Sequence, residues 1–151
     1  MDREIIARAG EIISRNTAQG ASEGASEGAE PYCVLALIGE NGGPTASAIT
    51  AAKADGIAWI AFCTGLTGNK ARRIAADGRA SVCFCAADHN ITLTGRIEVE
   101  TDPAVKNEMW YEGLKNHFSG VEDANYCVLR FRTERYNLLV DWKEAVGAYE
   151  N

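Results

Sequence analysis

The sequence predicts a mainly β (α+β) domain in which six or seven antiparallel strands close, or nearly close, into a barrel with α-helices at its margins. Three observations lead to this prediction. From Tyr32 onward, short apolar runs are separated by turn signals rich in Gly, Pro, Asn and Asp. Residues 91–99 alternate between apolar and polar side chains, as a strand with one buried face does. Helical periodicity is confined to short segments outside these runs.

The first segment predicts a helix over about residues 2–16. Asp2 stands at its N-cap position, and one apolar stripe follows at helical spacing: Ile5, Ile6, Ala9, Ile12 and Ile13. Residues 18–30 come next and include a repeated four-residue unit of small and acidic residues. Such a segment has nothing to bury, so we expect a flexible Gly/Ala/Ser/Glu loop there.

Seven later runs are expected to form the strands: residues 33–38, 45–52, 57–63, 80–86, 91–99, 126–132 and 135–140. Residues 39–44 and the pair Asp55-Gly56 carry turn signals between the first three runs, which favours an antiparallel meander. Gly95 interrupts the fifth run and is expected to mark a bend or a close approach of another backbone.

Two short helices are expected between strands. One covers residues 71–76 and ends at Gly78. The other begins after Asp102, with Pro103 at its first position. Its buried side is expected to consist of Val105, Met109, Trp110 and Leu114.

Length and charge limit the function classes. At 151 residues, the chain is long enough for one compact domain and short for two, so residues 1–151 are treated as a single domain. The net charge of −6, with Lys and Arg dispersed among acids, argues against a general nucleic-acid binder. No apolar run is long enough to cross a bilayer and the first residues lack a secretory signal, so we expect a cytoplasmic protein without membrane contact.

The cysteines predict no metal site. Their number is odd, and all lie in apolar strand-like runs, so we expect small reduced core residues: Cys33, Cys63, Cys83, Cys85 and Cys127. A zinc site with His89 is disfavoured, because its two nearby cysteines share one strand face and no second ligand pair has a familiar spacing.

The most informative motif spans residues 59–74. A buried strand ends at Thr64, passes through a loop with two glycines, and enters a helix that carries Lys70. The free N–H groups and positive dipole end of that helix, the hydroxyls of Thr64 and Thr67 and the Lys70 ammonium can converge on one anion. The motif therefore predicts a phosphate site.

A simpler interpretation of the same motif exists. Gly65 and Gly68 would only make a turn, while Thr67 or Asn69 caps the helix. The spacing does not decide between the two interpretations.

Several short motifs occur in a fixed order along the chain: residues 44–50 (PTASAIT), 62–70 (FCTGLTGNK), 79–84 (RASVCF), 93–99 (LTGRIEV), Asp102, Met109-Trp110 and 117–120 (HFSG). Together they resemble the pyridoxamine 5′-phosphate oxidase-like flavin-binding proteins, and most closely their small general-stress-protein branch. The resemblance covers about residues 32–142. It implies a split β-barrel that forms a homodimer and holds FMN in a groove between the subunits.

The resemblance also assigns candidate residues. Thr64 and Lys70 match positions that bind the cofactor phosphate, while Asn90 and Trp110 match positions that reach the flavin. The cofactor-binding candidates are Ser47, Phe62, Thr64, Thr67, Asn69, Lys70, Asn90 and Trp110. For Trp110 a core role remains open, because aromatic residues at helical spacing are often buried.

Ser47 departs from the family pattern, because many relatives carry an Arg there that clamps the phosphate. A neutral hydrogen bond contributes about 1 kcal/mol, against about 1.5–3 kcal/mol for a charged one. FMN affinity is therefore expected to be weak unless Lys53 or Arg73 supplies charge. The vitamin B6 oxidases end in an Arg- and His-containing substrate segment that residues 141–151 do not match. Pyridoxamine phosphate is not the expected substrate.

Three functional hypotheses follow. The first is an FMN-dependent oxidoreductase of a small molecule, such as a nitro- or quinone-type reductase. Flavin chemistry needs no side-chain acid or base, which suits a chain whose only histidines are His89 and His117, and the catalytic residues stay unassigned. The second is a protein that binds FMN, haem or a deazaflavin without turnover. The third is an empty barrel that serves as a dimerisation module.

Overall fold

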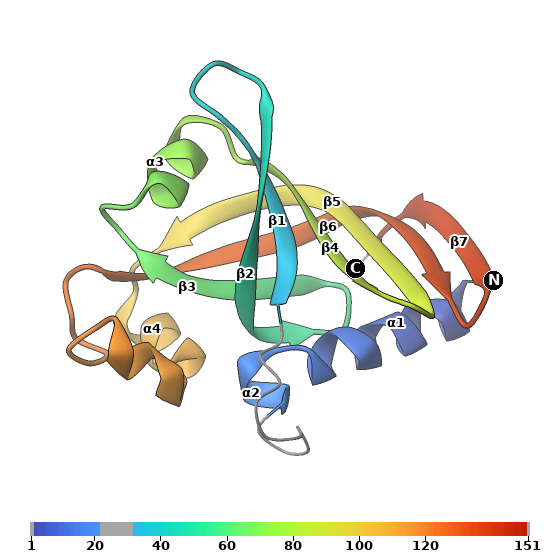
Figure 1. Cartoon of the computed structure of the whole chain (residues 1–151), viewed down its shortest axis with the longest axis horizontal. Coiled ribbons are helices and arrows are strands. Elements are labelled where there is room, and N and C mark those ends of the chain that lie inside the picture. The colour runs from blue at the N-terminus through green and yellow to red at the C-terminus, as the bar shows by residue number, and fades with distance from the viewer. Residues whose placement is uncertain (1, 22–31, 151) are drawn as a thin grey trace.

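The computed structural model contains an antiparallel sheet that curves into a barrel (Figure 1). It describes residues 2–21 and 32–150. Within these residues there are seven strands: β1 (Tyr32–Ile38), β2 (Pro44–Asp55), β3 (Trp59–Gly65), β4 (Arg79–Ala86), β5 (His89–Glu100), β6 (Tyr126–Val140) and β7 (Lys143–Ala148). Their order is β3-β2-β1-β4-β5-β6-β7, and pairing between β3 and β6 closes a six-stranded ring. The predicted barrel of antiparallel strands is confirmed.

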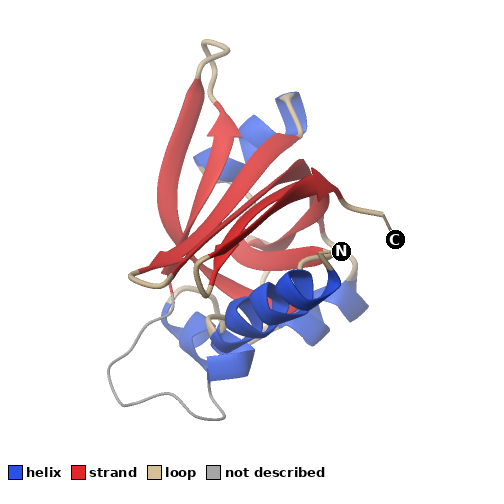
Figure 2. Cartoon of the chain, turned by 90° about the vertical axis from the view of Figure 1, so that its right-hand side faces the viewer, coloured by secondary structure: helices blue, strands red, loops and turns tan. Residues whose placement is uncertain are grey.

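The helices lie outside the strands, as Figure 2 shows. They are α1 (Arg3–Arg15), α2 (Ala18–Ala21), α3 (Asn69–Ala76), α4 (Pro103–Met109) and the 3₁₀ helix η1 (Glu112–Asn116). The helix α2 occupies the start of the segment that was expected to be a flexible loop, so that expectation is wrong for residues 18–21. The remainder of the expected loop, from residue 22, lies outside the described residues.

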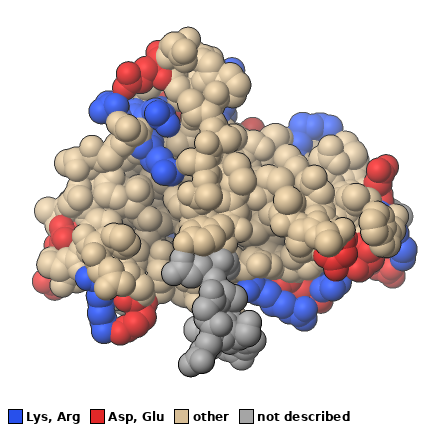
Figure 3. All heavy atoms as spheres, viewed as in Figure 1, with Lys and Arg blue, Asp and Glu red and all other residues tan. Residues whose placement is uncertain are grey.

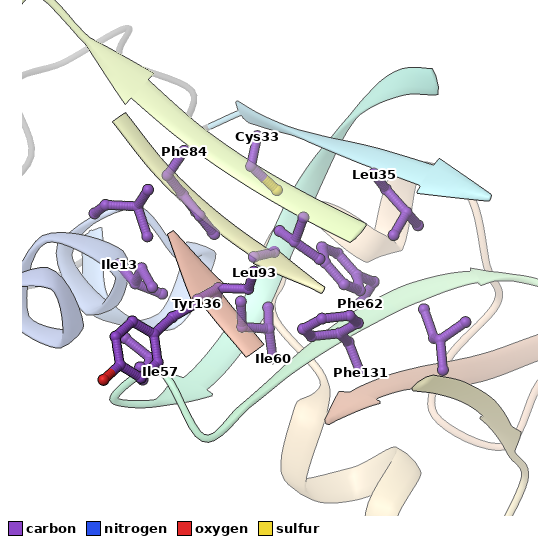
Figure 4. Close-up of a cluster of buried hydrophobic side chains, with 14 of the residues drawn as sticks. Ile13, Cys33, Leu35, Ile57, Ile60, Phe62, Phe84, Leu93, Phe131 and Tyr136 are labelled. Carbon is purple, nitrogen blue, oxygen red and sulfur yellow. The ribbon is translucent and has the colours of Figure 1, made fainter. Parts of the chain in front are cut away.

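The main core fills the barrel and includes one face of α1. Phe62, Phe131 and Leu93 point toward one another between the strands, and Ile13 approaches the cluster from α1 (Figure 4). Ile13 and Ala9 are fully buried, which confirms the predicted apolar stripe. Asp2 stands at the N-cap without a side-chain capping bond; its carboxylate instead accepts a hydrogen bond from the Tyr136 hydroxyl at 2.8 Å.

A second, smaller cluster covers the outer face of β3 and β6. The helix α4 contributes Met109 and the 3₁₀ helix η1 contributes Leu114, and both side chains pack with Ala61 and Tyr126. The second expected helix was too long: α4 ends at Met109, and Leu114 lies on η1. Its predicted start is correct, because the Asp102 carboxylate accepts a hydrogen bond from the Val105 N–H at 3.3 Å. This cluster anchors the segment that follows α4 against the sheet.

Two expectations about the last strands are corrected. Residues 126–132 and 135–140 were expected to be separate strands but belong to the single strand β6. A bulge opposite Thr94 and Gly95 absorbs the irregular residues, and the Thr133 hydroxyl donates a hydrogen bond to the Ile57 carbonyl. The strand β7 was not expected. It follows a two-residue turn whose central residues, Asp141 and Trp142, both have positive φ, as a type I′ hairpin turn requires.

Three of the five cysteines are core residues as expected, and all five are free. Cys33, Cys63 and Cys127 are buried. Cys83 is only half-buried and Cys85 is exposed, because both point to the outer face of β4. The expectation of a core position is therefore wrong for Cys85.

Candidate functional site

The candidate site lies where β3 leaves the sheet and the chain enters α3 (Figure 1). The connecting loop is held by Asn125, the residue before β6. The Leu66 N–H donates a hydrogen bond to the Asn125 carbonyl at 2.6 Å. The Thr67 N–H and hydroxyl both donate to the side-chain oxygen of Asn125, at 3.1 and 3.0 Å. Thr67 therefore positions the loop, and its hydroxyl proton is engaged within the protein.

Asn125 is a positioning residue that sequence reasoning missed. Its backbone N–H donates to the Asp123 carboxylate at 2.9 Å, and the Ser119 N–H donates to the same side chain at 2.9 Å. These hydrogen bonds lower the pKa of Asp123. A lone Asn before a strand carries no recognisable motif, so no sequence signal would have identified it.

The first turn of α3 is not capped by a side chain. Gly68 is the N-cap, and neither the Thr67 nor the Asn69 side chain accepts a hydrogen bond from an N–H group of the helix. Asn69 is the first helical residue, and its side-chain oxygen accepts a hydrogen bond from Arg72 at 2.6 Å. The proposed capping by Thr67 or Asn69 is therefore wrong. The N–H groups of residues 69–71 have no hydrogen-bond partner among the described residues, so they are available to an anion.

Basic side chains gather on α3, as the space-filling view shows over that helix (Figure 3). Arg72 is neutralised by Glu40 of the β1–β2 hairpin at 2.7 Å. Lys70 forms no ion pair with any residue in the described ranges. Arg73 has a buried Nε atom without a hydrogen-bond partner in the same part of the chain. Two of the three cations of this helix thus lack a counter-charge among the residues that the structure describes.

Ser47 and Thr64 point to the same side of the sheet near this loop. Ala51 of β2 is paired with Phe62 of β3. Ser47 is four residues from Ala51, and Thr64 is two residues beyond Phe62; even spacing places all of them on one face. Ser47 is exposed and Thr64 half-buried. The structure thus brings Ser47 and Thr64 to the end of the barrel where the helix with Lys70 begins.

The side chain of Phe62 belongs to the main core. It is fully buried within the barrel, where it packs against Phe131 and its neighbours (Figure 4). Phe62 is on the same face of β3 as Thr64 but two residues further from the loop, where that face is fully buried inside the barrel. The Phe62 side chain therefore has a core role, and its assignment as a cofactor contact stays a prediction.

Asn90 lies at the opposite end of the barrel from Thr64. On β6, Asn90 is paired with Leu139 and Thr64 with Cys127, twelve positions apart. At about 3.3 Å per residue, this separation is roughly 40 Å along the strand. FMN is much shorter, so within one chain it cannot contact both residues. The Asn90 side chain is exposed and accepts a hydrogen bond from the Thr92 hydroxyl at 3.1 Å.

Trp110 follows α4 and packs against the second cluster. Its ring meets the ring of Tyr126 edge to face, with centroids 5.3 Å apart. Tyr126 directly follows the loop-positioning Asn125, so Trp110 is at the same end of the barrel as the loop. Burial and the neighbouring Cys63 thiol raise the pKa of Tyr126, whose hydroxyl donates to the Lys106 carbonyl at 2.7 Å.

A largely uncharged surface covers the outer face of β1 and its neighbours, as the centre of Figure 3 shows. Val34 is 42% exposed and stands between Ala48 of β2 and Cys83 of β4. Tyr32, 58% exposed, lies next along β1 on the same face. Asn90 borders this surface, because β5 pairs it with Cys85 of β4. We call the outer face formed by these residues the β1 face.

No described helix has the length and apolar character needed to span a bilayer. Within the described residues, no group of three or more His, Cys, Asp or Glu side chains is arranged to hold a metal ion.

Comparison with known proteins gives one family and one fold. The family model described as "Pyridoxamine 5'-phosphate oxidase" matches residues 26–139. A protein from Clostridium acetobutylicum related to general stress protein 26 has a TM-score of 0.68 and 24% identity, over 78% of this chain and 84% of its own. A heme binding protein from Mycobacterium smegmatis has a TM-score of 0.68 and 18% identity, over 95% and 57%. No curated protein matches this chain.

A further similar structure carries a different family name. A nimC/nimA family protein from Clostridium acetobutylicum has a TM-score of 0.64 and 18% identity, over 78% of this chain and 84% of that one. At these identities the three structures establish only the split-barrel fold. The match to the family model establishes the family to which the chain belongs.

Proposed function

The chain belongs to the pyridoxamine 5′-phosphate oxidase family, and from this premise we propose that it is an FMN-binding flavoprotein that oxidises or reduces a small molecule. The observation that carries the proposal is the uncapped, cationic start of α3 beside the end of β3. Free N–H groups, the helix dipole and an unpaired Lys70 together form a site for a phosphate dianion. FMN supplies the hydride or electron transfer when it is bound.

The residues present fit the phosphate end of FMN. Lys70 would provide the charge, the N–H groups of residues 69–71 would donate hydrogen bonds, and the hydroxyls of Ser47 and Thr64 would add neutral donors. The buried Nε of Arg73, which lacks a partner among the described residues, is a further sign that an acceptor belongs here.

A homodimer would complete the site. Within one chain, Asn90 is too far from Lys70 to share a ligand with it. A second copy packed on the β1 face would bring its own Asn90 to the edge of the interface, because Asn90 borders that face. The exposed apolar side chains of Tyr32 and Val34 support this face as the contact. The cofactor groove would then lie between the subunits.

The substrate is proposed to be a small molecule other than pyridoxamine phosphate. A nitro- or quinone-type acceptor is the preferred class. We place the activity in the cytoplasm, because five free cysteines suit a reducing compartment.

The direct test is to load the purified protein with FMN, remove excess cofactor by desalting and record the visible spectrum. Retained flavin absorbance, followed by anaerobic bleaching with reduced nicotinamide cofactor and reoxidation by a quinone or nitro compound, is the expected result. A folded protein that retains no flavin would refute the proposal.

Lys70 provides a matched test of the phosphate site. The variant Lys70→Gln should weaken FMN binding about tenfold to a hundredfold, because a charged hydrogen bond contributes about 1.5–3 kcal/mol. Lys143→Gln, on the exposed strand β7, is the control and should leave the dissociation constant unchanged. Fluorescence quenching of FMN gives both constants. Equal affinities for the two variants would contradict the role of Lys70.

A second candidate function is cofactor binding without turnover. It is favoured by Ser47, which provides no charge at a position where relatives hold the phosphate, and by the structural similarity to a heme binding protein. Titration with haemin should then give a saturable Soret band, and FMN-loaded protein should oxidise no donor. Turnover of FMN-loaded protein with any physiological donor would reject this candidate.

A further inference from the structure

We propose that Arg73 is a second phosphate-binding cation of the FMN site and replaces the charge that relatives place at the position of Ser47. This inference rests on the proposed function, because it names a ligand of the same cofactor. It concerns one side chain of α3 and is supported by three features: its buried unpaired atom, its position relative to Lys70, and the ion pairs of the other nearby cations.

The first feature is the Nε atom of Arg73. It is buried and has no hydrogen-bond partner among the residues that the structure describes. Buried donors are almost always paired, and an unpaired charged donor is especially unfavourable. Backbone groups of the same helix do not satisfy it, so an acceptor outside the described chain would remove this cost.

The second feature is the geometry of α3. Lys70 and Arg73 are three residues apart and therefore share one side of the helix. Side chains of a helix lean toward its N-terminus, which carries the guanidinium of Arg73 back over the first turn. That turn presents the free N–H groups. The two like charges repel each other when no anion lies between them, and a phosphate dianion would convert this repulsion into attraction.

The third feature is the state of the neighbouring cations. Lys53, which sequence reasoning offered as a substitute for the missing arginine, is paired with Glu108 of α4 at 3.3 Å. Arg72 is paired with Glu40 at 2.7 Å. Only Arg73 combines a place beside Lys70 with the absence of a counter-charge in the described ranges. Its planar guanidinium can also bind phosphate through two hydrogen bonds, as the family arginine would.

The test compares Arg73→Gln with Arg72→Gln, its direct neighbour on the same helix. Dissociation constants for FMN and for riboflavin, which lacks the phosphate, are measured by fluorescence quenching at fixed ionic strength. Arg73→Gln should weaken FMN binding about tenfold or more and leave riboflavin binding unchanged. Arg72→Gln should change both constants by less than about twofold, because it removes an exposed ion pair with Glu40 and an exposed hydrogen bond to the Asn69 side chain, and leaves the backbone N–H groups in place.

Placing a positive charge at position 47, on β2, gives an independent check. In the Arg73→Gln background, Ser47→Arg should recover most of the lost FMN affinity, and Arg73→Lys should show a smaller loss than Arg73→Gln. If Arg73→Gln fails to fold, the Nε–H resonance of Arg73 in the intact protein is followed by NMR, with Arg73→Lys used for assignment. It should shift on addition of FMN and stay in place with riboflavin.

The outcomes separate this inference from the proposed function. An intact protein that binds FMN, combined with equal FMN affinities of the Arg73→Gln and Arg72→Gln variants, would overturn the role of Arg73 and leave the proposed function standing. An Arg73 Nε–H resonance that FMN does not shift would do the same. An intact protein that binds no FMN would overturn both.

Discussion

The five free cysteines differ sharply in their chemistry at the residue scale. Burial raises the pKa of Cys33 and of Cys63 to about 12, and that of Cys127 to about 11. Only thiolates react readily, so these three side chains are both inaccessible and protonated. Cys85 is exposed on the outer face of β4. The thiol chemistry of the folded protein is therefore concentrated on one strand.

This difference predicts selective alkylation. Iodoacetamide at pH 8 should modify Cys85 first, while Cys33, Cys63 and Cys127 stay unmodified until the protein is unfolded in urea. Peptide mass spectrometry before and after unfolding measures both. Cys85→Ser serves as the control and should abolish the early modification. Early modification of Cys63 in folded protein would contradict the predicted burial.

The same shifts fix the direction of a pH effect. A thiol whose pKa is higher in the folded than in the unfolded state binds its proton more tightly when folded, so its stabilising contribution is complete below the unfolded pKa near 9. It is lost as the pH rises from about 9 toward about 12. The urea midpoint should therefore fall between pH 8 and pH 10.5, and Cys63→Ala should reduce that fall.

Local motifs allowed part of the site to be predicted at this scale. Thr64 and Lys70 lie within seven residues of each other, so their proximity follows from the chain itself. The core position of the Phe62 side chain depends on how the strands close around it. The proposed role of Arg73 depends on which of the nearby cations form ion pairs with other parts of the chain. Such facts arise only when distant segments pack together, as Glu40 does with Arg72.

At the element scale, the join between β5 and β6 is a region of tight steric constraint. A Cβ atom on Gly95 would lie 2.0 Å from the Arg132 carbonyl oxygen. The bulge opposite Gly95 pushes the β6 backbone toward it and lets β6 continue as one long strand. Both barrel closure and the pairing of β7 depend on that continuity.

Gly95→Ala should accordingly destabilise the protein by at least about 2 kcal/mol, because overpacking against backbone forces the two strands apart. Gly120→Ala is the control; a Cβ there meets no atom within 4 Å, so its effect should be small. Chemical denaturation in urea gives the two free energies of unfolding. Equal values would show that the strands separate without cost.

Element existence was easier to predict than element continuity. The alternation of residues 91–99 and the cap at Asp102 are local signals, and both were interpreted correctly. The continuity of β6 through Thr133 and Glu134 depends on a bulge, and β7 depends on a turn whose Asp-Trp pair lacks the usual glycine. Neither feature has a sequence signal of its own, because each is stabilised by pairing with another strand.

For the whole molecule, the distribution of charge indicates how two copies would associate. The chain carries a net charge of −6, yet its β1 face is nearly uncharged (Figure 3). Such a face is unusual on a monomer that carries so many acids elsewhere. If the proposed dimer forms there, cofactor binding and association become linked, because each groove would draw residues from both copies.

If the proposed dimer forms through the β1 face, Val34→Glu should convert it to a monomer and reduce FMN retention. Burying an uncompensated carboxylate costs about 3–5 kcal/mol, which raises the dimer dissociation constant at least about a hundredfold. Val146→Glu, at another exposed valine on β7, should leave the proposed dimer intact. Size-exclusion chromatography with light scattering measures the molecular masses of the two variants. A Val34→Glu variant that remains dimeric would exclude the β1 face as the interface.

The closed ring of six strands has one more consequence. Because β3 pairs with β6, each of the six ring strands has a neighbour on both sides over part of its length, and of the described strands only β7 has a neighbour on one side alone. An open strand margin of this kind recruits other chains unless charge or brevity prevents it. β7 has only six residues and carries Lys143 and Glu144. Conditions that neutralise those two side chains should therefore favour fibrous self-association through the unpaired edge of β7.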